Sequence, residues 1–308
     1  MELKFTKEDL KRMQALPLYR KIMISQTRIV EWYLKNQGKV YVSYSGGKDS
    51  SVLLDLVRRA YPEVPAVYVD TRLDYPEVRE HVKNTENVIF LKPDMNFRQV
   101  IDTYGFCFPS KDVAQSIEAA RRNVPYASNF FDGKLKDGTD KLFYDKFKKW
   151  KWLVDTDLKI SAKCCAIMKE KPLIKFQKDT GLNPYIGILA SESRRRLLSW
   201  YRHGCNAFDI KFPKSKPLSF WTEQDVLRYI IDYDVKIPSV YGSILMNKKG
   251  KLKCTGEQRT GCVYCPIGSH LDKVNKFQRL KLSHPELYKF CMEQLGLDEF
   301  LTAVKVPH

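Results

Sequence analysis

Apolar positions along the chain fall into two patterns that alternate. Short runs rich in Val, Ile and Tyr are typical of buried strands, and four occur at 40–44, 66–69, 88–91 and 184–189. Longer stretches carry apolar residues every three to four positions, as from residue 48 to residue 60, which predicts helices. Strands that alternate with helices predict an α/β fold with a doubly wound, mostly parallel sheet.

Residues 1–37 precede the first strand and predict two helices. Thr6 and Asp9 have the spacing of a capping box, Pro17 interrupts the helical pattern, and Gly38 is a plausible stop. The alternation is broken again at about 105–160, where a helix is expected from Lys111 to Arg122 after a turn.

The first strand and the first long helix are joined by Ser45-Gly-Gly-Lys-Asp-Ser50. Two glycines let the backbone turn sharply and approach a ligand closely. The N–H groups of such a turn and of the helix N-terminus point to one place, which suits an anion, and Lys48 adds a charge. The Walker A pattern is absent. The loop therefore predicts a phosphate site; a polar turn without a ligand is the alternative.

Charged side chains follow two other predicted strands. Asp70 ends the strand at 66–69, and Arg194, Arg195 and Arg196 follow the strand at 184–189. The carboxyl ends of parallel strands meet at the ligand crevice of an open sheet. Asp70 is expected to orient a nucleotide or hold Mg²⁺, or else to cap the next helix. The arginines are expected to bind phosphates, or else to form a run of solvent-exposed charges.

Four of the eight cysteines have a spacing that suggests a shared metal. Cys164 and Cys165 are adjacent, and Cys262 and Cys265 form a CxxC in which two thiolates can reach one metal. A 4Fe–4S cluster and a structural zinc are both compatible with four thiolates. Cys254 lies near the CxxC and is a candidate sulfur carrier. The others are expected to be buried, namely Cys107, Cys205 and Cys291.

Composition limits the partners and the compartment. The 308 residues include 53 Lys and Arg against 36 Asp and Glu, a net charge of +17 that attracts polyanions larger than a free nucleotide. A merely soluble basic protein is the alternative. Basic residues interleave with Phe143, Tyr144, Phe147 and Trp150, which fits base stacking or a surface helix equally well.

The apolar runs are too short to cross a membrane, and the N-terminus lacks the apolar core of a signal peptide. We therefore expect a cytoplasmic protein whose cysteines are metal ligands or thiols rather than disulfides.

Ser45–Ser50 resembles the SGGxDS PP-loop of the ATP pyrophosphatase superfamily, which holds the pyrophosphate of ATP while the bond between the α and β phosphates is cut. Residues 69–78 and 216–226 resemble segments of phosphoadenylyl-sulfate (PAPS) reductases, and the cysteine pattern resembles the 4Fe–4S ligands of adenylyl-sulfate reductases. The resemblance covers about residues 38–270. It implies an adenine nucleotide alpha hydrolase-like fold.

Three segments follow from this resemblance. They are an N-terminal helical segment at 1–37, a PP-loop nucleotide-binding domain at 38–245 with an insertion at about 105–160, and a C-terminal lobe at 246–308 that carries the CxxC.

The resemblance also implies site residues and cofactors. The implied cofactors are ATP, Mg²⁺ and a 4Fe–4S cluster. Catalysis is assigned to Lys48, Asp49 and Cys254, and the cluster to the four cysteines at 164, 165, 262 and 265. The residues expected to bind the nucleotide are Ser43, Ser45, Gly46, Gly47, Lys48, Asp49, Ser50, Asp70, Arg194 and Arg195.

Two departures indicate which branch of the family the chain resembles. Sulfonucleotide reductases have a degenerate loop, whereas both glycines and Lys48 are present here; their cysteine-bearing tail motif is not found at 295–308. The combination resembles the iron–sulfur ATP pyrophosphatases of DNA phosphorothioation, with tRNA thiolases second. It implies that ATP activates a nucleic-acid acceptor, DNA or RNA, for sulfur from a cysteine desulfurase or another donor. A PAPS or adenylyl-sulfate reductase and a non-catalytic ATP- and nucleic-acid-binding module with a structural metal are the alternatives.

Overall fold

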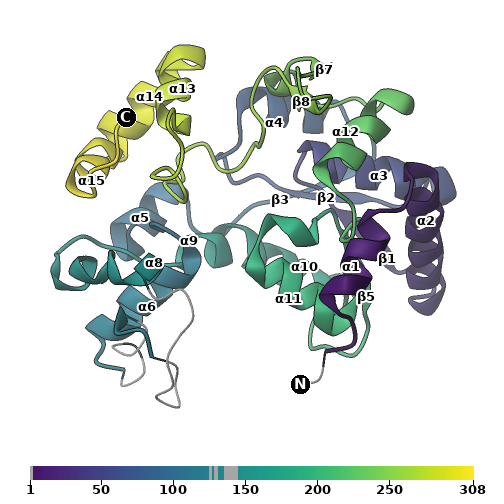
Figure 1. Cartoon of the computed structure of the whole chain (residues 1–308), viewed down its shortest axis with the longest axis horizontal. Coiled ribbons are helices and arrows are strands. Elements are labelled where there is room, and N and C mark those ends of the chain that lie inside the picture. The colour runs from purple at the N-terminus through teal and green to yellow at the C-terminus, as the bar shows by residue number, and fades with distance from the viewer. Residues whose placement is uncertain (1–2, 125–126, 128–130, 135–144) are drawn as a thin grey trace. The chain divides into compact units, whose positions relative to one another are not determined.

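The computed structural model describes residues 3–124, 127, 131–134 and 145–308 (Figure 1). The chain forms two compact units: unit 1 comprises 1–70, 74–92 and 172–261, and unit 2 comprises 71–73, 93–171 and 262–308. These units are divided differently from the three segments expected, because the insertion and the CxxC belong to the same unit. Phe143 and Tyr144 of the basic and aromatic run lie outside the described residues.

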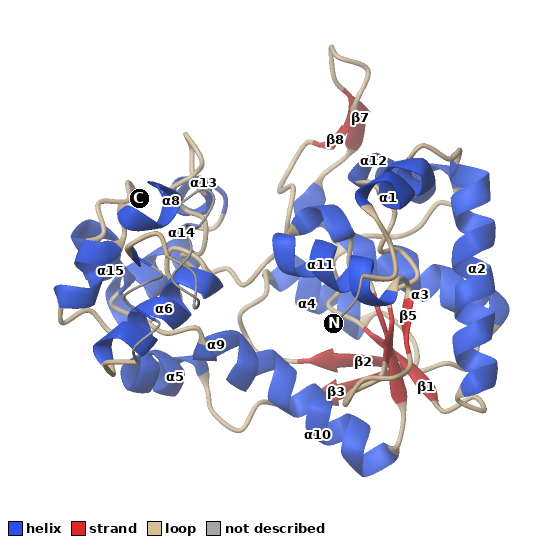
Figure 2. Cartoon of the chain, turned by 60° about the horizontal axis from the view of Figure 1, so that its bottom comes forward, coloured by secondary structure: helices blue, strands red, loops and turns tan. Residues whose placement is uncertain are grey.

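Unit 1 is built on a six-stranded sheet, and this confirms the predicted fold class. The strand order is β3-β2-β1-β4-β6-β5, and every pairing is parallel except that of β5 with β6. Figure 2 shows the strands at the centre of unit 1 with helices around them. The strands are β1 (Val40–Ser43), β2 (Ala66–Val69), β3 (Val88–Leu91), β4 (Asn183–Ile186), β5 (Asn206–Ala207) and β6 (Lys214–Ser215).

The first strand lies in the interior of the sheet, as its apolar sequence requires. Val42 pairs with Ala66 of β2 on one side and Tyr185 of β4 on the other, and all three are fully buried. The chain runs outward from β1 through β2 to β3 and then returns to β4 on the opposite side of β1. The order of the strands therefore reverses between β1 and β4, which is where open α/β sheets bind ligands.

The predicted N-terminal helices are confirmed as α1 (Lys7–Gln14) and α2 (Leu18–Lys35). Thr6 and Asp9 form the expected capping box, and Pro17 is the N-cap of α2. Lys21 of α2 is buried and pairs at 2.6 Å with Asp225, the residue that also completes the capping box of α12.

The helix after the glycine turn, α3 (Lys48–Ala60), is almost wholly buried along its apolar face. Val52, Leu53, Leu56 and Val57 are all at 0% exposure, and each contributes about 1.5–3 kcal/mol by leaving water. The remaining elements of unit 1 are α4 (Pro76–Lys83), α10 (Lys171–Thr180), α11 (Arg194–His203), α12 (Glu223–Asp232), β7 (Ile244–Met246), β8 (Leu252–Cys254) and two 3₁₀ turns, Ala190–Glu192 and Ser239–Tyr241.

Unit 2 is helical in the part that the structure describes. The predicted helix after the turn at Gly105–Ser110 is confirmed as α6 (Lys111–Arg121). The other helices are α5 (Phe97–Tyr104), α8 (Asp145–Lys148), α9 (Lys163–Cys165), α13 (Lys276–Ser283), α14 (Pro285–Lys289) and α15 (Leu297–Ala303), with a 3₁₀ helix at Lys151–Asp155 and π-helical stretches at Ala166–Glu170 and Phe290–Gln294.

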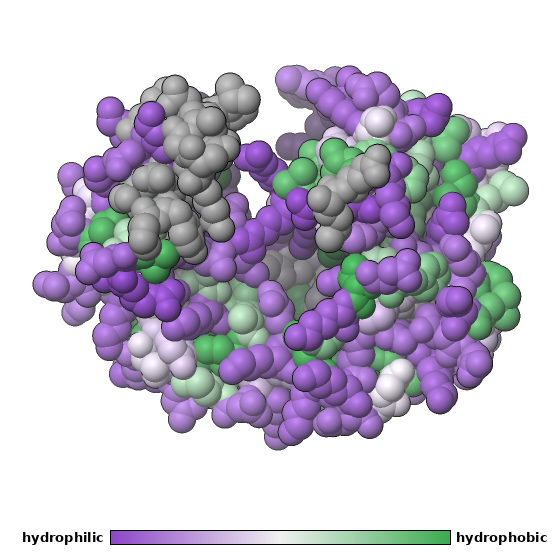
Figure 3. Space-filling model, turned by 90° about the horizontal axis from the view of Figure 1, so that it is seen from below, coloured by the Kyte–Doolittle hydropathy of each residue, from purple (hydrophilic) through white to green (hydrophobic). Residues whose placement is uncertain are grey.

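The surface matches the charged composition. The face shown in Figure 3 carries mostly hydrophilic residues. None of the helices described combines the length and the apolarity that crossing a bilayer requires.

Candidate functional site

The glycine turn has the sharp geometry that its sequence predicts. Gly46 adopts φ of +70°, and a Cβ there would lie 2.5 Å from Cγ2 of Val82 and 2.9 Å from Cγ1 of Val78. Gly47 is the N-cap of α3, and a Cβ on it would lie 3.1 Å from the Tyr241 hydroxyl. Glycine is therefore required at 46 by conformation and space together.

The serine hydroxyls of the turn stabilise the turn itself. The Ser45 N–H donates to Oγ of Ser50 at 3.3 Å, and the two hydroxyl oxygens are 3.1 Å apart. The Ser50 hydroxyl donates to the Gly47 carbonyl at 2.9 Å. Two of the predicted nucleotide ligands thus hold the loop in shape.

Lys48 is the most enclosed charged group of the turn. Its side chain is 4% exposed, and its Nζ donates to the Gln258 carbonyl at 2.8 Å. The same ammonium lies 3.3 Å from a carboxylate oxygen of Glu223 and 3.9 Å from one of Asp49. Three oxygens, from the Gln258 carbonyl and the carboxylates of Glu223 and Asp49, thus lie around this side-chain nitrogen.

The backbone N–H of Lys48 also has a partner in unit 1 that is remote in the sequence. It donates to the Tyr241 hydroxyl oxygen at 3.1 Å, and that oxygen lies 2.7 Å from Oγ1 of Thr260. Burial raises the pKa of Tyr241, so the group is a neutral hydroxyl at neutral pH. The first N–H of the helix therefore faces an oxygen acceptor without a negative charge.

Asp49 and Arg196 have opposite charges near the same turn. Burial raises the pKa of Asp49, the Lys48 ammonium opposes this, and Glu223 adds to it. Burial lowers the pKa of Arg196, while the Asp49 carboxylate acts in the other direction. Arg196 also pairs with Glu192 in its own segment. Arg194 and Arg195, predicted to bind phosphate, are exposed on α11.

The sheet reversal and the glycine turn coincide. Gly187 follows β4, and a Cβ on it would lie 3.0 Å from the Asp49 carbonyl oxygen. This close approach favours glycine at 187. Strand β4 ends just before it at Ile186, three residues before the end of the apolar run predicted as a strand. Ser43, at the end of β1, pairs with Ile186 and Val67 in the sheet.

Asp70 ends β2 as predicted, but its carboxylate has a cationic partner. The Nε and Nη2 atoms of Arg79 lie 3.3 and 3.4 Å from its two oxygens, and the Asp70 side chain is 15% exposed. An Mg²⁺ ion at Asp70 would have to compete with this guanidinium.

Cys254 lies at the end of β8 and is 6% exposed. Burial raises the pKa of its thiol, and the nearby Lys48 ammonium opposes that rise. A buried cysteine that keeps its proton is a weak nucleophile.

Several residues at the loop were missed by sequence reasoning, because they are remote in the chain. They are Glu223, Tyr241, Gln258, Arg259 and Thr260. For Gln258, Arg259 and Thr260 the available signal is the polar stretch between Gly256 and Gly261; for the other two residues the sequence offers none.

The four cysteines predicted to bind a metal all belong to unit 2, and three backbone segments bring them together there. Phe106 forms a parallel bridge with Ile160, shortly before Cys164 and Cys165. The segment that contains Phe106 also contacts the chain just after the CxxC, because the Gly268 N–H donates to the Pro109 carbonyl at 3.1 Å.

The thiols are close enough to affect one another. The pKa of Cys164 is raised, first by burial and then by the thiols of Cys165, Cys262, Cys265 and Cys107. A set of thiols around one buried thiol suits a soft metal or an iron–sulfur cluster. Among the described residues, however, no three His, Cys, Asp or Glu side chains are already spaced to hold a metal ion.

Basic groups accompany the cysteines. Burial alone would lower the pKa of Lys111, but Cys165 and Glu170 outweigh it and raise that pKa. Lys276 donates from Nζ to the Cys262 carbonyl at 3.0 Å. Cationic neighbours stabilise thiolates, the form that binds metals.

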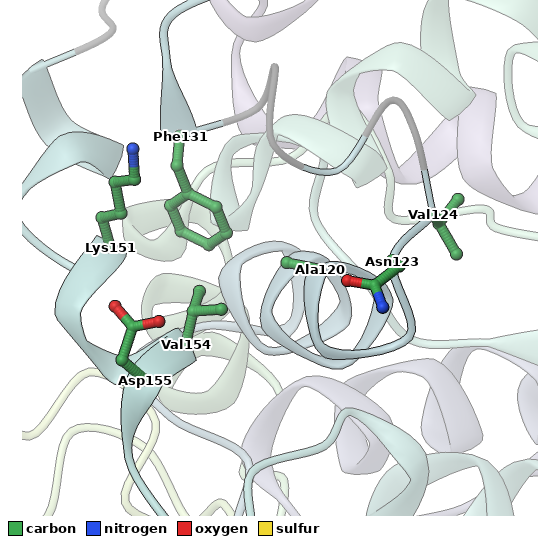
Figure 4. Close-up of a pocket in the computed structure, with 7 residues that line it drawn as sticks. All are labelled: Ala120, Asn123, Val124, Phe131, Lys151, Val154 and Asp155. Atoms are coloured by element: carbon green, nitrogen blue, oxygen red, sulfur yellow. The ribbon is translucent and has the colours of Figure 1, made fainter.

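Unit 2 also contains a cavity of about 320 Å³ beside the C-terminal end of α6. Figure 4 shows Phe131 and Val154 projecting toward it, with Lys151 and Asp155 from the same 3₁₀ helix nearby. Ala120, Asn123 and Val124 complete the lining, and none of the predicted site residues takes part.

Comparison with known proteins identifies a family and two relatives of this chain. The family model of the phosphoadenosine phosphosulfate reductase domain matches residues 39–115 and 132–267. An uncharacterized protein of Methanocaldococcus jannaschii is 23% identical over 256 residues, which are 80% of this chain and 40% of that protein. An adenosine 5'-phosphosulfate reductase of Halalkalibacterium halodurans is 25% identical over 84 residues, 25% of this chain and 36% of that protein. The chain thus spans about two fifths of the length of the curated relatives it matches.

Two solved structures are similar at low identity. A phosphoadenylyl-sulfate reductase from Candida auris, in a phosphate complex, has a TM-score of 0.42 and 13% identity over 85% of this chain and 100% of its own. An FMN adenylyltransferase from Candida glabrata, in complex with ATP, has a TM-score of 0.42 and 13% identity over 75% of this chain and 64% of its own. The order of the strands already shows the fold, and these two similarities add no evidence to it.

Proposed function

The chain belongs to the phosphoadenosine phosphosulfate reductase domain family, and we propose that within it the chain cleaves ATP to AMP and pyrophosphate to activate a nucleic-acid acceptor for sulfur insertion. The observation that carries the proposal is the enclosure of Lys48 at the glycine turn, at the point where the strand order reverses. The adenosine 5'-phosphosulfate reductase among the relatives is an enzyme that acts on an adenine nucleotide.

The proposed pyrophosphate site uses donors that now bind internal oxygens. The N–H of Lys48 donates to the Tyr241 hydroxyl, and its Nζ donates to the Gln258 carbonyl. Both acceptors are uncharged oxygens, so a phosphate oxygen would form the stronger, charge-assisted bond in their place. ATP binding thus exchanges two internal contacts for two contacts to the pyrophosphate.

In the proposed reaction, an oxygen of the acceptor attacks the α phosphorus of ATP. A P–O bond forms to the acceptor, the bond between the α phosphorus and the bridging oxygen breaks, and pyrophosphate leaves with the electron pair. Lys48 and the loop N–H groups stabilise the charge that develops on pyrophosphate. Sulfide then displaces AMP, which leaves with the former acceptor oxygen.

Two arginines add positive charge to the proposed site. The cations Arg196 and Arg259 act on Asp49, so the charge of that carboxylate is partly neutralised before a polyanion arrives. Mg²⁺ bound with the nucleotide would screen the phosphates further, with Asp49 as an oxygen ligand of the right type.

The cysteines of unit 2 supply the ligand set of the proposed 4Fe–4S cluster. Cys164, Cys165, Cys262 and Cys265 would hold it, and a bound cluster would supply electron transfer or a site for sulfide. Lys111, which interacts electrostatically with Cys165, would place a positive charge beside the cluster. We assign no step to Cys254, because its thiol is buried and protonated.

A reductase acting on a sulfonucleotide is the second candidate. The partial match to an adenosine 5'-phosphosulfate reductase favours it. This candidate predicts thioredoxin-dependent sulfite formation from a sulfonucleotide and no consumption of ATP.

Pyrophosphate release from ATP, measured with and without DNA or RNA, tests the proposal. Wild type should release pyrophosphate only when nucleic acid is present. Lys48→Ala should lower the rate about 10²–10³-fold, the usual loss for one donor to a developing anion. Lys35→Ala, which removes an exposed lysine of α2, is the control and should be unchanged. Equal rates for Lys48→Ala and Lys35→Ala would overturn the proposal.

A further inference from the structure

Strands β7 and β8 form a hairpin that is separate from the main sheet. They pair antiparallel, with Ile244 opposite Cys254 and Met246 opposite Leu252. Figure 2 shows this ribbon extending away from the body of unit 1, beyond α12. Residues 248–251 at the turn of the ribbon are exposed, so they are available to a partner.

The tip of the hairpin has a defined conformation. Oδ1 of Asn247 accepts the N–H groups of Lys249 at 2.9 Å and Lys251 at 3.0 Å. The Asn247 N–H donates to the Lys251 carbonyl at 2.8 Å, and Gly250 supplies the φ of +69° that closes the turn. The lysines next to these positions are therefore presented from a fixed backbone.

The hairpin is strongly and uniformly basic. Residues 242–256 include no Asp or Glu, and they carry four lysines, all exposed: Lys248, Lys249, Lys251 and Lys253. Leu245 and Met246 are 58% and 62% exposed beside them. Four cations around an apolar strip complement a partner that presents phosphates on either side of a groove in which thymine methyl groups offer apolar contacts.

Strand β8 is held against α12 next to the turn of the hairpin, where Leu252 pairs with Met246. The Gln224 side chain of α12 bonds both backbone groups of Leu252, at 3.0 and 2.8 Å. The chain on either side of the hairpin then leads to Tyr241 and Thr260, which meet at the N–H of Lys48. A partner bound to the hairpin is therefore bound by an element whose flanking residues contact the glycine turn.

We propose that the β7–β8 hairpin is a docking element for duplex DNA, with the ribbon in the major groove and the lysines on the flanking phosphates. The inference rests on the proposed function, since it identifies the nucleic acid. The major groove of B-DNA, about 12 Å wide, admits a two-stranded ribbon. The major groove of duplex RNA is deep and too narrow for side chains to read. The shape of the hairpin therefore selects DNA.

Binding of a labelled DNA duplex, measured at several salt concentrations, tests this assignment. The test variant replaces the four hairpin lysines by glutamine. The matched control replaces four exposed lysines elsewhere in unit 1 by glutamine, namely Lys7, Lys11, Lys35 and Lys39. ATP binding by each variant verifies that the nucleotide site is intact. A duplex RNA of the same sequence and the single strands complete the comparison.

The hairpin variant should bind duplex DNA at least about tenfold more weakly than the control variant at one salt concentration. Its slope of log affinity against log salt should be smaller by about 3–4, since each phosphate contact contributes about 0.9. Equal binding by the two variants would overturn the assignment, and so would duplex RNA bound as tightly as DNA. If the hairpin lysines are needed for DNA binding but DNA never elicits pyrophosphate release, the docking site stands and the proposed reaction fails.

Discussion

Replacing Gly46 by alanine tests how the glycine turn is held. Gly46 has φ of +70°, and the added Cβ would lie 2.5 Å from Cγ2 of Val82 and 2.9 Å from Cγ1 of Val78. Both valines are fully buried on α4. A valine in a helix has one strongly preferred rotamer, so neither side chain can turn away cheaply.

The expected cost has two parts, and a second glycine separates them. A left-handed conformation costs a non-glycine residue about 1–2 kcal/mol, and overpacking of a buried site costs about 1–3 kcal/mol. Gly181 has nearly the same φ, +71°, but a Cβ there would meet no atom within 4 Å. Gly181→Ala should therefore show the backbone part alone, and Gly46→Ala should lose about 1–3 kcal/mol more.

Thermal unfolding of the two variants measures this difference. At about 2–4 °C per kcal/mol for units of this size, Gly46→Ala should melt about 2–12 °C below Gly181→Ala. It should also lose pyrophosphate release, because any shift of the turn moves the N–H of Lys48. Equal melting temperatures would show that α4 yields to the methyl group and that the space around Gly46 is not what requires glycine.

Three further predictions follow from single groups. Tyr241→Phe removes the hydroxyl that accepts the Lys48 N–H. ATP would then no longer have to displace this hydroxyl, so the KM for ATP should fall by up to about fivefold, the value of one net hydrogen bond. A raised KM would contradict the proposal that a phosphate oxygen replaces the Tyr241 oxygen. Burial lowers the pKa of Lys216 from 10.5 to about 8, so between these pH values the unfolded chain binds more protons. As pH rises across that window, the free energy of unfolding of wild type should therefore increase by up to about 3 kcal/mol relative to that of Lys216→Met. Urea unfolding at successive pH values measures this; a constant difference would refute it. Cys164→Ser should lose bound iron and acid-labile sulfide on anaerobic purification, whereas Cys205→Ser, a buried thiol of unit 1, should retain both; equal iron in the two would exclude Cys164 as a ligand.

The parts of the site that could be predicted from the sequence are those set by local geometry. The turn at Gly46 and Gly47, the strand before it and the helix after it are fixed within about twenty residues, and each was expected where it occurs. The capping boxes at Thr6 and Thr222 are equally local. Backbone sterics and helix-end hydrogen bonds decide such features, and both can be read from neighbouring residues.

The partners of these residues could not be predicted, because tertiary packing selects them. The sequence predicts that Asp70 orients a nucleotide or holds Mg²⁺, but it does not predict that Arg79 lies against this carboxylate. Three adjacent arginines look equivalent in sequence, yet it is Arg196 that is partly buried near Asp49. Tyr241 is 193 residues from Lys48, and nothing in the local pattern around it marks a residue of the loop.

The central claim is that the turn at Gly46–Lys48 receives the pyrophosphate of ATP. Its most direct test is to supply ATP labelled on its α phosphate together with duplex DNA and sulfide, and to identify the labelled product. The account predicts labelled AMP, an equal amount of pyrophosphate, and loss of both in Lys48→Ala. Labelled ADP, or unchanged ATP with every nucleic acid supplied, would contradict it.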